Sequence, residues 1–271
     1  MQSVRQPAVA GAFYSGQRAA LSAEVMALLA AAKPDPGLHT TLPKALIVPH
    51  AGYVYSGATA ARAYARLAAG RDTIRRVVLL GPVHRVPVRG LALPGVAFFA
   101  TPLGHIEIDQ AAIDLLTDLP QVVVSSPAHA MEHSLEVQLP FLQSVLADFK
   151  LLPLAVGDAT PAEVAEVLEA LWGGPETLIV ISSDLSHFLP YRTAQAVDQK
   201  TVQTMLALEA QLTHEQACGG TPVNGLLLAA KHHHLQPQLL QLCNSGDTAG
   251  DKGRVVGYAS LALTARHPHE H

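Results

Sequence analysis

The feature that most limits the fold of this chain is a series of short, uninterrupted apolar runs separated by helix-like stretches. The clearest of these runs lie at residues 45–49, 75–81, 151–155 and 177–183. Strands that are apolar on both sides need cover on both faces, which is typical of parallel sheets with helices above and below. The pattern therefore predicts an α/β fold with a mainly parallel or mixed central sheet and helices on both faces.

The remaining elements follow from the same patterns. Shorter strands are expected at 91–99, 121–124, 238–243 and 254–263. Helices are expected at 57–69, 109–118, 134–148, 161–172, 193–211 and 221–233. Thr160 and Pro161 are the residue types preferred just before and at the first position of a helix. The last strand alternates in part between apolar and polar residues, which favours an antiparallel strand.

Composition limits the class of protein. No linker, repeat or low-complexity run divides the 271 residues, so we expect a single domain over 1–266 and a histidine-rich tail at 267–271. A net charge of −4 without a long basic run argues against nucleic-acid binding. Two cysteines, no signal-peptide pattern and no apolar stretch of the ~18 residues that span a bilayer predict a cytoplasmic protein with no membrane partner.

Polar side chains follow four of the expected strands. In open α/β sheets, ligands bind outside the carboxyl ends of the strands. The side chains at those ends are His50, His84, Asp184, His187, Asn244, Ser245 and Asp247. One histidine after a strand is more often a structural residue than a ligand, but four such ends on one edge predict a shared site. Tyr53 and Tyr55, beside His50, are expected to line a recognition pocket there, although one of them can equally pack in the core.

Residues 131–142, MEHSLEVQLPFL, supply a fifth group. Glu136 follows His133 by three residues, so the two side chains can face the same way on a helix. Glu132 and His129 can join the same loop, and a solvated charged turn is the alternative. Ser134 is the expected N-cap of the helix that follows.

Histidines with an oxygen ligand and open positions suit Fe(II) or Zn(II). A further histidine can then act as an acid or base. Asp184 is placed three residues before His187 and can orient that ring. No P-loop, GxGxxG or GxSxG motif is present to suggest other chemistry. His232, His233 and His234 are consecutive on an expected helix and so point in different directions, which favours a solvated helix end over a metal site.

Several motifs also occur in a recognisable order: VPHAGYVYSG, LLGPVHR, EHSLEVQLPFL, SSDLSH and NSGD, preceded by RQPAVAGAFYSG. Together they resemble the Memo family, whose prokaryotic members are called AmmeMemoRadiSam system protein B. The likeness runs from about residue 4 to residue 263. The family name implies two partners in the same system, an AMMECR-like protein and a radical S-adenosylmethionine (SAM) protein.

The Memo family is similar in fold to the LigB-like class III extradiol dioxygenases, which hold a non-haem Fe(II) with two histidines and a carboxylate. By matching motif, the resemblance makes His50 and His84 the imidazole ligands and His187 the acid/base histidine. Asp247 is expected as the third ligand, with Thr248 and Cys243 as alternatives. Fe(II) is the favoured metal, and Zn or Cu are alternatives.

Two functional hypotheses follow. The first is a metal-dependent oxidoreductase of the dioxygenase-like kind, with catalytic residues His187, Asp184 and His133. The second is a non-catalytic module that binds a peptide, small molecule or protein in a vestigial active-site cleft. For either, the expected binding residues are Tyr53, Tyr55, Glu132, Glu136, Asn244 and Ser245.

Overall fold

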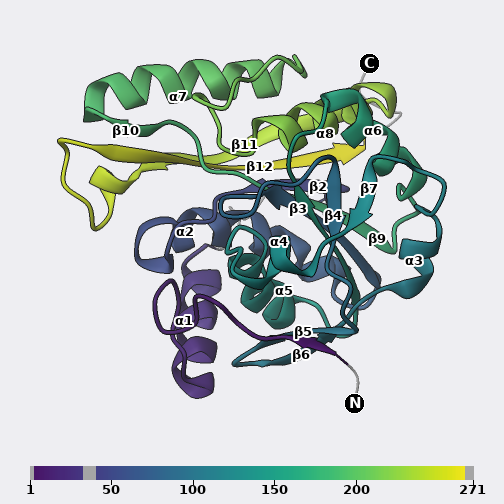
Figure 1. The fold of residues 1–271 in the computed structure, drawn as a ribbon. Coiled ribbons are helices and arrows are strands. Elements are labelled where there is room, and N and C mark those ends of the chain that lie inside the picture. Colours follow the sequence, from purple (N-terminus) through teal and green to yellow (C-terminus); the bar gives the residue numbers. More distant parts are fainter. Residues whose placement is uncertain (1–2, 33–40, 266–271) are drawn as a thin grey trace.

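The computed structural model describes residues 3–32 and 41–265 of the chain (Figure 1). Within this part, a sheet of nine strands forms the centre of the molecule. In spatial order eight of its strands are β10 (His187–Leu189), β12 (Val255–Ala265), β2 (Ala45–Val48), β9 (Thr177–Ser182), β3 (Arg76–Pro82), β8 (Lys150–Val156), β4 (Leu91–Leu93) and β7 (Val122–Val124). The ninth strand, β11 (Leu235–Asn244), pairs with β12.

The strands at the centre of this sheet run in one direction. β2, β9, β3 and β8 are mutually parallel. β4 is antiparallel to β8, and β12 is antiparallel to both β2 and β11. β11 therefore runs the same way as β2. The expected mixed sheet and the expected antiparallel last strand are both confirmed.

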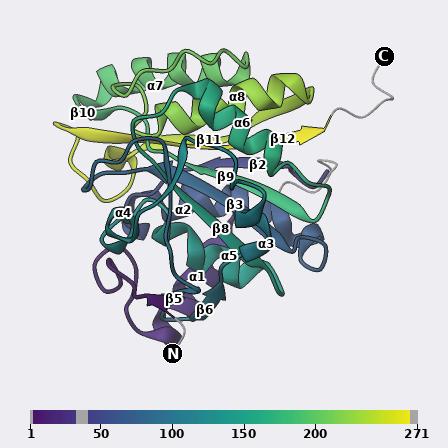
Figure 2. The same ribbon diagram turned by 45° about the vertical axis from the view of Figure 1, so that its right-hand side comes forward.

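Helices cover both faces of the sheet, as predicted. α6 (Pro161–Ala170), α7 (Tyr191–Leu206) and α8 (Gly220–His232) lie on one side, and α1 (Arg18–Ala31), α2 (Tyr53–Tyr64) and α5 (Leu139–Val145) lie on the other (Figures 1 and 2). Successive residues of β2 alternate between the two cores: Leu46 packs in the core with α2, whereas Ile47 packs in the core with α6 and α8. This alternation explains why the central strands read as continuously apolar.

A small second sheet lies at one end of the molecule and was not predicted. It consists of β1 (Val4–Arg5), β5 (Phe98–Thr101) and β6 (Gly104–Glu107). The expected strand at 91–99 is thus split between β4 and β5. α3 (Gln110–Asp114) lies within the helix expected at 109–118, and the 3-10 helix η1 (Ala65–Gly70) forms the end of the helix expected at 57–69. α1 and α4 (Ser126–Ala130) were not predicted.

The segment at 134–148 differs most from its prediction. Ser134 does not cap a helix there; instead its hydroxyl donates to the carbonyl of Pro82, at 2.9 Å. A 3-10 turn, η2 (Glu136–Gln138), precedes α5. Pro140 lies in the first turn of α5, where its missing N–H leaves no donor unpaired. By contrast, Thr160 caps α6 as predicted and forms a full capping box with Glu163.

None of the helices in the described residues is long and apolar enough to cross a membrane. The predicted tail at 267–271 lies outside the described residues.

Candidate metal centre

Three neighbouring parallel strands deliver functional side chains to one edge of the sheet. β9 lies between β2 and β3. His50, Asp184 and His84 each follow the end of one of these strands by two residues. The site is thus set by the sheet itself, at the edge where α/β proteins bind ligands.

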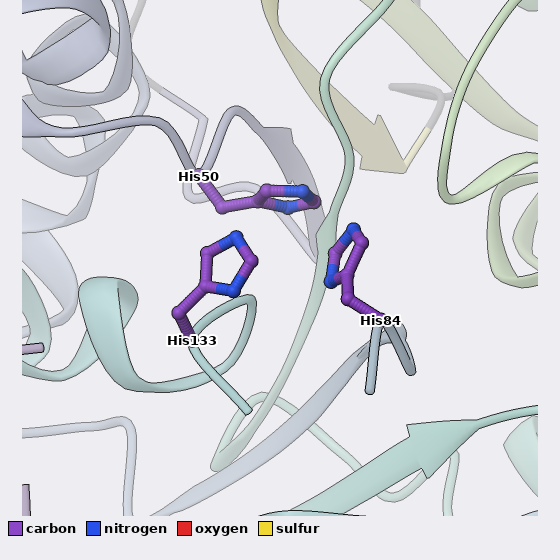
Figure 3. A group of neighbouring side chains, drawn as sticks. All are labelled: His50, His84 and His133. Atoms are coloured by element: carbon purple, nitrogen blue, oxygen red, sulfur yellow. The ribbon is translucent and has the colours of Figure 1, made fainter. Parts of the chain in front are cut away.

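His50 and His84 meet a third histidine, His133, which comes from the loop between α4 and η2 (Figure 3). One ring nitrogen of each lies within 4.8 Å of the others. The ring centroids are 4.6 Å apart for His84 and His133 and 5.5 Å apart for His50 and His133. The three imidazoles therefore surround a common point. We call His50, His84 and His133 the histidine cluster.

The loop that carries His133 approaches β3 closely because residue 81 is a glycine. A Cβ atom placed on Gly81 would lie 2.9 Å from the hydroxyl oxygen of Ser134 and 3.0 Å from a methyl group of Leu135. Any side chain at this position would push the loop away from the strand. Gly81 in the motif LLGPVHR therefore helps to bring His133 beside His84.

A hydrogen-bond chain fixes the proton of His50. The Ser182 hydroxyl donates its only proton to the carbonyl of Ser134, at 2.6 Å. It must therefore accept from Nδ1–H of His50, at 2.8 Å, and it also accepts from the amide of Gln138. Nε2 of His50 is therefore unprotonated and carries the lone pair of the ring. This is the atom that a metal would take, and it lies 3.2 Å from the sulfur of Cys218.

Glu132 fixes the proton of His84 in the same way. Its carboxylate accepts from the backbone N–H of His84 at 2.6 Å and contacts Nδ1 of the same residue at 2.9 Å. The backbone N–H groups of His133 and Ser134 also donate to it. Carboxylates that bind the ring nitrogen that a metal does not use typically orient metal-binding histidines. Glu132, predicted as a binding residue, therefore holds His84 in position within the cluster.

The electrostatics of the cluster favour neutral imidazoles. Burial lowers the pKa of His50 to about 3 and that of His133 to about 4, and the neighbouring histidines act in the same direction. Burial alone would raise the pKa of Glu132, but hydrogen bonds and charge from His84 outweigh it and hold that pKa at about 2. At neutral pH the site therefore combines the uncharged imidazoles of His50 and His133 with the ionised carboxylate of Glu132. Imidazole ligands of this kind fit Fe(II), Zn(II) or Cu(II).

Asp184 and His187 flank the cluster but do not bond to each other as expected. The Asp184 carboxylate accepts from the backbone N–H of His50 at 2.7 Å, and burial raises its pKa. Nδ1 of His187 lies 2.9 Å from the carbonyl of Leu185, so it is the protonated nitrogen and Nε2 is the basic one. Asp184 thus positions His50 rather than His187.

Cys218 is a member of the site that the sequence did not indicate. Its sulfur contacts Nε2 of His50, and because that nitrogen carries no proton the thiol is the donor. Burial, with the charge of Asp184, raises the pKa of the thiol to about 12. Cys218 precedes α8 and lies far along the chain from every expected ligand, so no spacing could have revealed it.

Glu136 does not share a site with His133. Its fully buried carboxylate pairs with Arg5 and accepts from the hydroxyl of Tyr14 at 2.6 Å. The backbone N–H groups of Ala8 and Val9 also donate to it, at 2.7 and 3.0 Å. Glu136 therefore ties the N-terminal segment to the loop of the cluster. It does not share a face with His133, because His133 lies in the loop before the 3-10 turn that begins at Glu136.

The two tyrosines after His50 lie on α2 and have separate environments. Tyr53 is buried, donates from its hydroxyl to the carbonyl of Val137 at 2.7 Å, and packs on Phe141. Tyr55 is 38% exposed. Tyr53 is accordingly a core residue, and Tyr55 is the one that faces solvent.

Asn244, Ser245 and Asp247 form a separate turn. The side chains of Asn244 and Asp247 make a capping box around the 3-10 turn η3 (Ser245–Asp247). Asp247 also accepts a short hydrogen bond from Tyr191. The cluster of ligand atoms found around His50 and His84 includes His133 and not Asp247. Asp247 differs from its predicted role because its two oxygens already cap this turn and bind Tyr191.

The alternative third ligands and His129 also have other partners. Cys243 contacts the hydroxyl of Thr59 at 3.0 Å, and Thr248 donates to the carbonyl of Ser245 at 3.1 Å. His129 is buried, and its Nε2 lies 2.7 Å from the carbonyl of Ala92. The structure does not bring these three residues into the histidine cluster.

Comparison with known proteins gives the family. Residues 5–262 match the family model described as "Memo-like protein". A MEMO1 family protein of Sulfurisphaera tokodaii is 35% identical, and the match covers 95% of this chain and 98% of that protein. A MEMO1 family protein of Aquifex aeolicus is 36% identical with the same coverage. An uncharacterized protein of Escherichia coli K12 of known structure matches with 16% identity and a TM-score of 0.49, over 80% of this chain and 98% of that one. The motifs, the family model and the near full-length matches agree, and the chain belongs to the Memo family.

Proposed function

We propose that the histidine cluster binds a divalent transition metal, with Fe(II) as the first candidate and Zn or Cu as alternatives. The observation that carries this proposal is the fixed protonation of two of the rings. Ser182 and Glu132 each hold a protonated Nδ1, which leaves Nε2 of His50 and His84 unprotonated and able to bind a metal. His133 supplies the third nitrogen. Three protein ligands leave positions open for substrate.

We assign oxidoreductase chemistry of the dioxygenase-like kind to this centre. A bound metal of this class would supply a redox-active or Lewis-acidic ion beside the substrate. His187, half-buried on β10, is the proposed acid/base residue, because its free Nε2 can take a proton while Nδ1 stays bonded to Leu185. Asp184 and Cys218 are the proposed positioning residues, since both contact His50.

Metal analysis after anaerobic purification tests this assignment. The parent chain is expected to contain about one more ion per chain than the His50→Ala/His84→Ala double variant, because the double variant lacks two of three ligands. Glu132→Gln should weaken metal affinity by about 10–100-fold, since it loses the charge that orients His84. His105→Ala, at an exposed histidine on β6, is the matched control. Equal metal content in the parent and the double variant would contradict the proposal.

A second candidate function is the binding of a partner at the same edge of the sheet. Large apolar side chains beside the site residues are exposed: Val54 by 65%, Met131 by 53% and Phe188 by 59%. Phe188 also has a φ of 60°, a conformation that a bulky residue rarely adopts and that often marks a functional site. The partners proposed for this surface are the AMMECR-like and radical SAM proteins of the same system, or a peptide or small molecule.

Pull-down with the two purified proteins tests this second function. We expect association that persists after chelation and that weakens in Val54→Ser, because exposed apolar surface beside the site would be buried in the complex. Val124→Ser is the matched control, since Val124 is 68% exposed but lies on the outermost strand β7. Loss of association on chelation, or no association at all, would count against a binding module.

A further inference from the structure

A second group of metal-ligating side chains lies away from the histidine cluster, where α6 and α8 end. Glu169 is on the last turn of α6, and His232 and His233 close α8. One carboxylate oxygen of Glu169 lies 3.0 Å from Nδ1 of His232, and the other lies 2.8 Å from Nε2 of His233. All three potential ligand atoms lie within 4.8 Å of one another.

Consecutive histidines can converge here because the helix ends between them. His232 is the last residue of α8, His233 is its C-cap, and His234 adopts a left-handed conformation with a φ of 54°. The two rings also use different atoms: His232 presents the near nitrogen Nδ1, and His233 presents the far nitrogen Nε2. The expectation that adjacent side chains diverge holds only inside a regular helix, so it does not apply at this point.

The ring of His233 is held in place by Trp172. The two rings are stacked, with centroids 3.8 Å apart and an angle of 9° between their planes. The ammonium nitrogen Nζ of Lys44 also lies over Trp172, 5.4 Å from the centre of the indole ring. Because this stacking already fixes the imidazole ring, His233 loses less conformational entropy when it binds an ion.

The distances match those around a bound ion. Two ligand atoms at the usual Zn–N and Zn–O bond lengths of about 2.1 Å are about 3.0 Å apart at a right angle and about 3.4 Å apart at the tetrahedral angle. The observed 3.0 and 2.8 Å contacts need little change to reach these values. His232 is 73% exposed, which leaves the outer coordination positions to water.

We propose that Glu169, His232 and His233 form a second, surface metal site that takes a divalent ion of the Zn(II), Ni(II) and Cu(II) class and joins the ends of α6 and α8. Two imidazoles and one carboxylate are ligands that suit these ions. On binding, each ring moves its proton to its other nitrogen, and the two N–H···O contacts to Glu169 are replaced by bonds to the ion. This site is independent of the function proposed for the histidine cluster.

Trp172 provides the measurement, because it is the only tryptophan of the chain and it touches a ligand. The experiment uses the full chain with His267, His269 and His271 changed to alanine, so that the tail cannot contribute. Titration with Ni(II) is expected to quench the tryptophan emission in a saturable manner that fits a single class of site beside Trp172. Prior addition of Zn(II), which does not quench, should block the effect.

Glu169→Gln and His232→Ala are the test variants, since both keep the stacked pair of Trp172 and His233. Each should start with the emission of the parent and bind Ni(II) at least about tenfold more weakly, because a ligand matters at least as much as an outer-shell partner. His214→Ala, at an exposed histidine elsewhere, should leave the titration unchanged, and so should His50→Ala/His84→Ala. Unsaturable quenching in the parent chain, or equal affinity in Glu169→Gln, would overturn the proposal.

Discussion

Replacement of Glu136 by alanine is expected to lower the free energy of unfolding by about 3–5 kcal/mol, the usual effect of removing one partner of a buried ion pair. Both side chains of the pair are buried, with Arg5 5% exposed and Glu136 not exposed at all. The variant leaves the Arg5 charge without its carboxylate. It also leaves the hydroxyl of Tyr14 and two backbone N–H groups without their acceptor.

Thermal denaturation followed by circular dichroism measures this effect as a fall of roughly 10 °C in Tm. Glu107→Ala is a well-matched control. Glu107 pairs with Lys150 at 2.7 Å, but the two side chains are 52% and 51% exposed, and solvent-exposed pairs of this kind add little to stability. If the two variants lose the same stability, burial of the Arg5–Glu136 pair is not what holds the N-terminal segment.

Acid is expected to destabilise the chelator-treated chain through its buried histidines, and His129 shows the sign clearly. Burial lowers the pKa of His129 to about 4, from an ordinary value of 6.5. Below about pH 6.5 the unfolded chain therefore binds a proton that the folded chain does not. The free energy of unfolding falls as the pH drops from 6.5 towards 4, by about 3 kcal/mol for this one histidine. His50 and His133 act in the same direction.

Urea denaturation at several pH values between about 7 and 4.5, followed by tryptophan emission, measures this dependence. In His129→Gln the loss of stability towards acid should be smaller by roughly 1 kcal/mol per pH unit, because one titrating group is gone. His105→Gln, at an exposed position, should retain the full dependence. An unchanged pH dependence in His129→Gln would show that this ring does not stay neutral in the folded chain.

The central part of the fold could be predicted from the sequence because its cause is local. A strand covered on both faces is apolar on both sides, and β2, β3, β8 and β9 show this along their length, with polar residues only at their ends. The small sheet of β1, β5 and β6 has no such pattern. Its strands have two to four residues each and depend on contacts between distant parts of the chain.

The candidate site was partly predictable for a related reason. His50 and His84 follow strong strands, so their positions at one edge of the sheet come from the strand pattern alone. His133 was expected at the site as a catalytic residue, but its position beside His84 was not predicted, because its loop is set by the close approach at Gly81 and by the carboxylate of Glu132. Sequence spacing suggested a helical face shared with Glu136, but helical structure begins only at Glu136, so His133 stays in the loop and the carboxylate turns to Arg5.

The position of β9 between β2 and β3 has a consequence for the choice of ion. Neighbouring strands are about 4.8 Å apart, so the backbones that carry His50 and His84 are separated by roughly 10 Å. Strand pairing fixes this separation, so repacking of the core cannot change it unless hydrogen bonds between the strands break. His50 and His84 each lie two residues beyond the end of a strand, whereas His133 lies inside the loop between α4 and η2. Substitutions that adapt this centre to a larger or smaller ion are therefore expected at residues 131–135 and not in the strands.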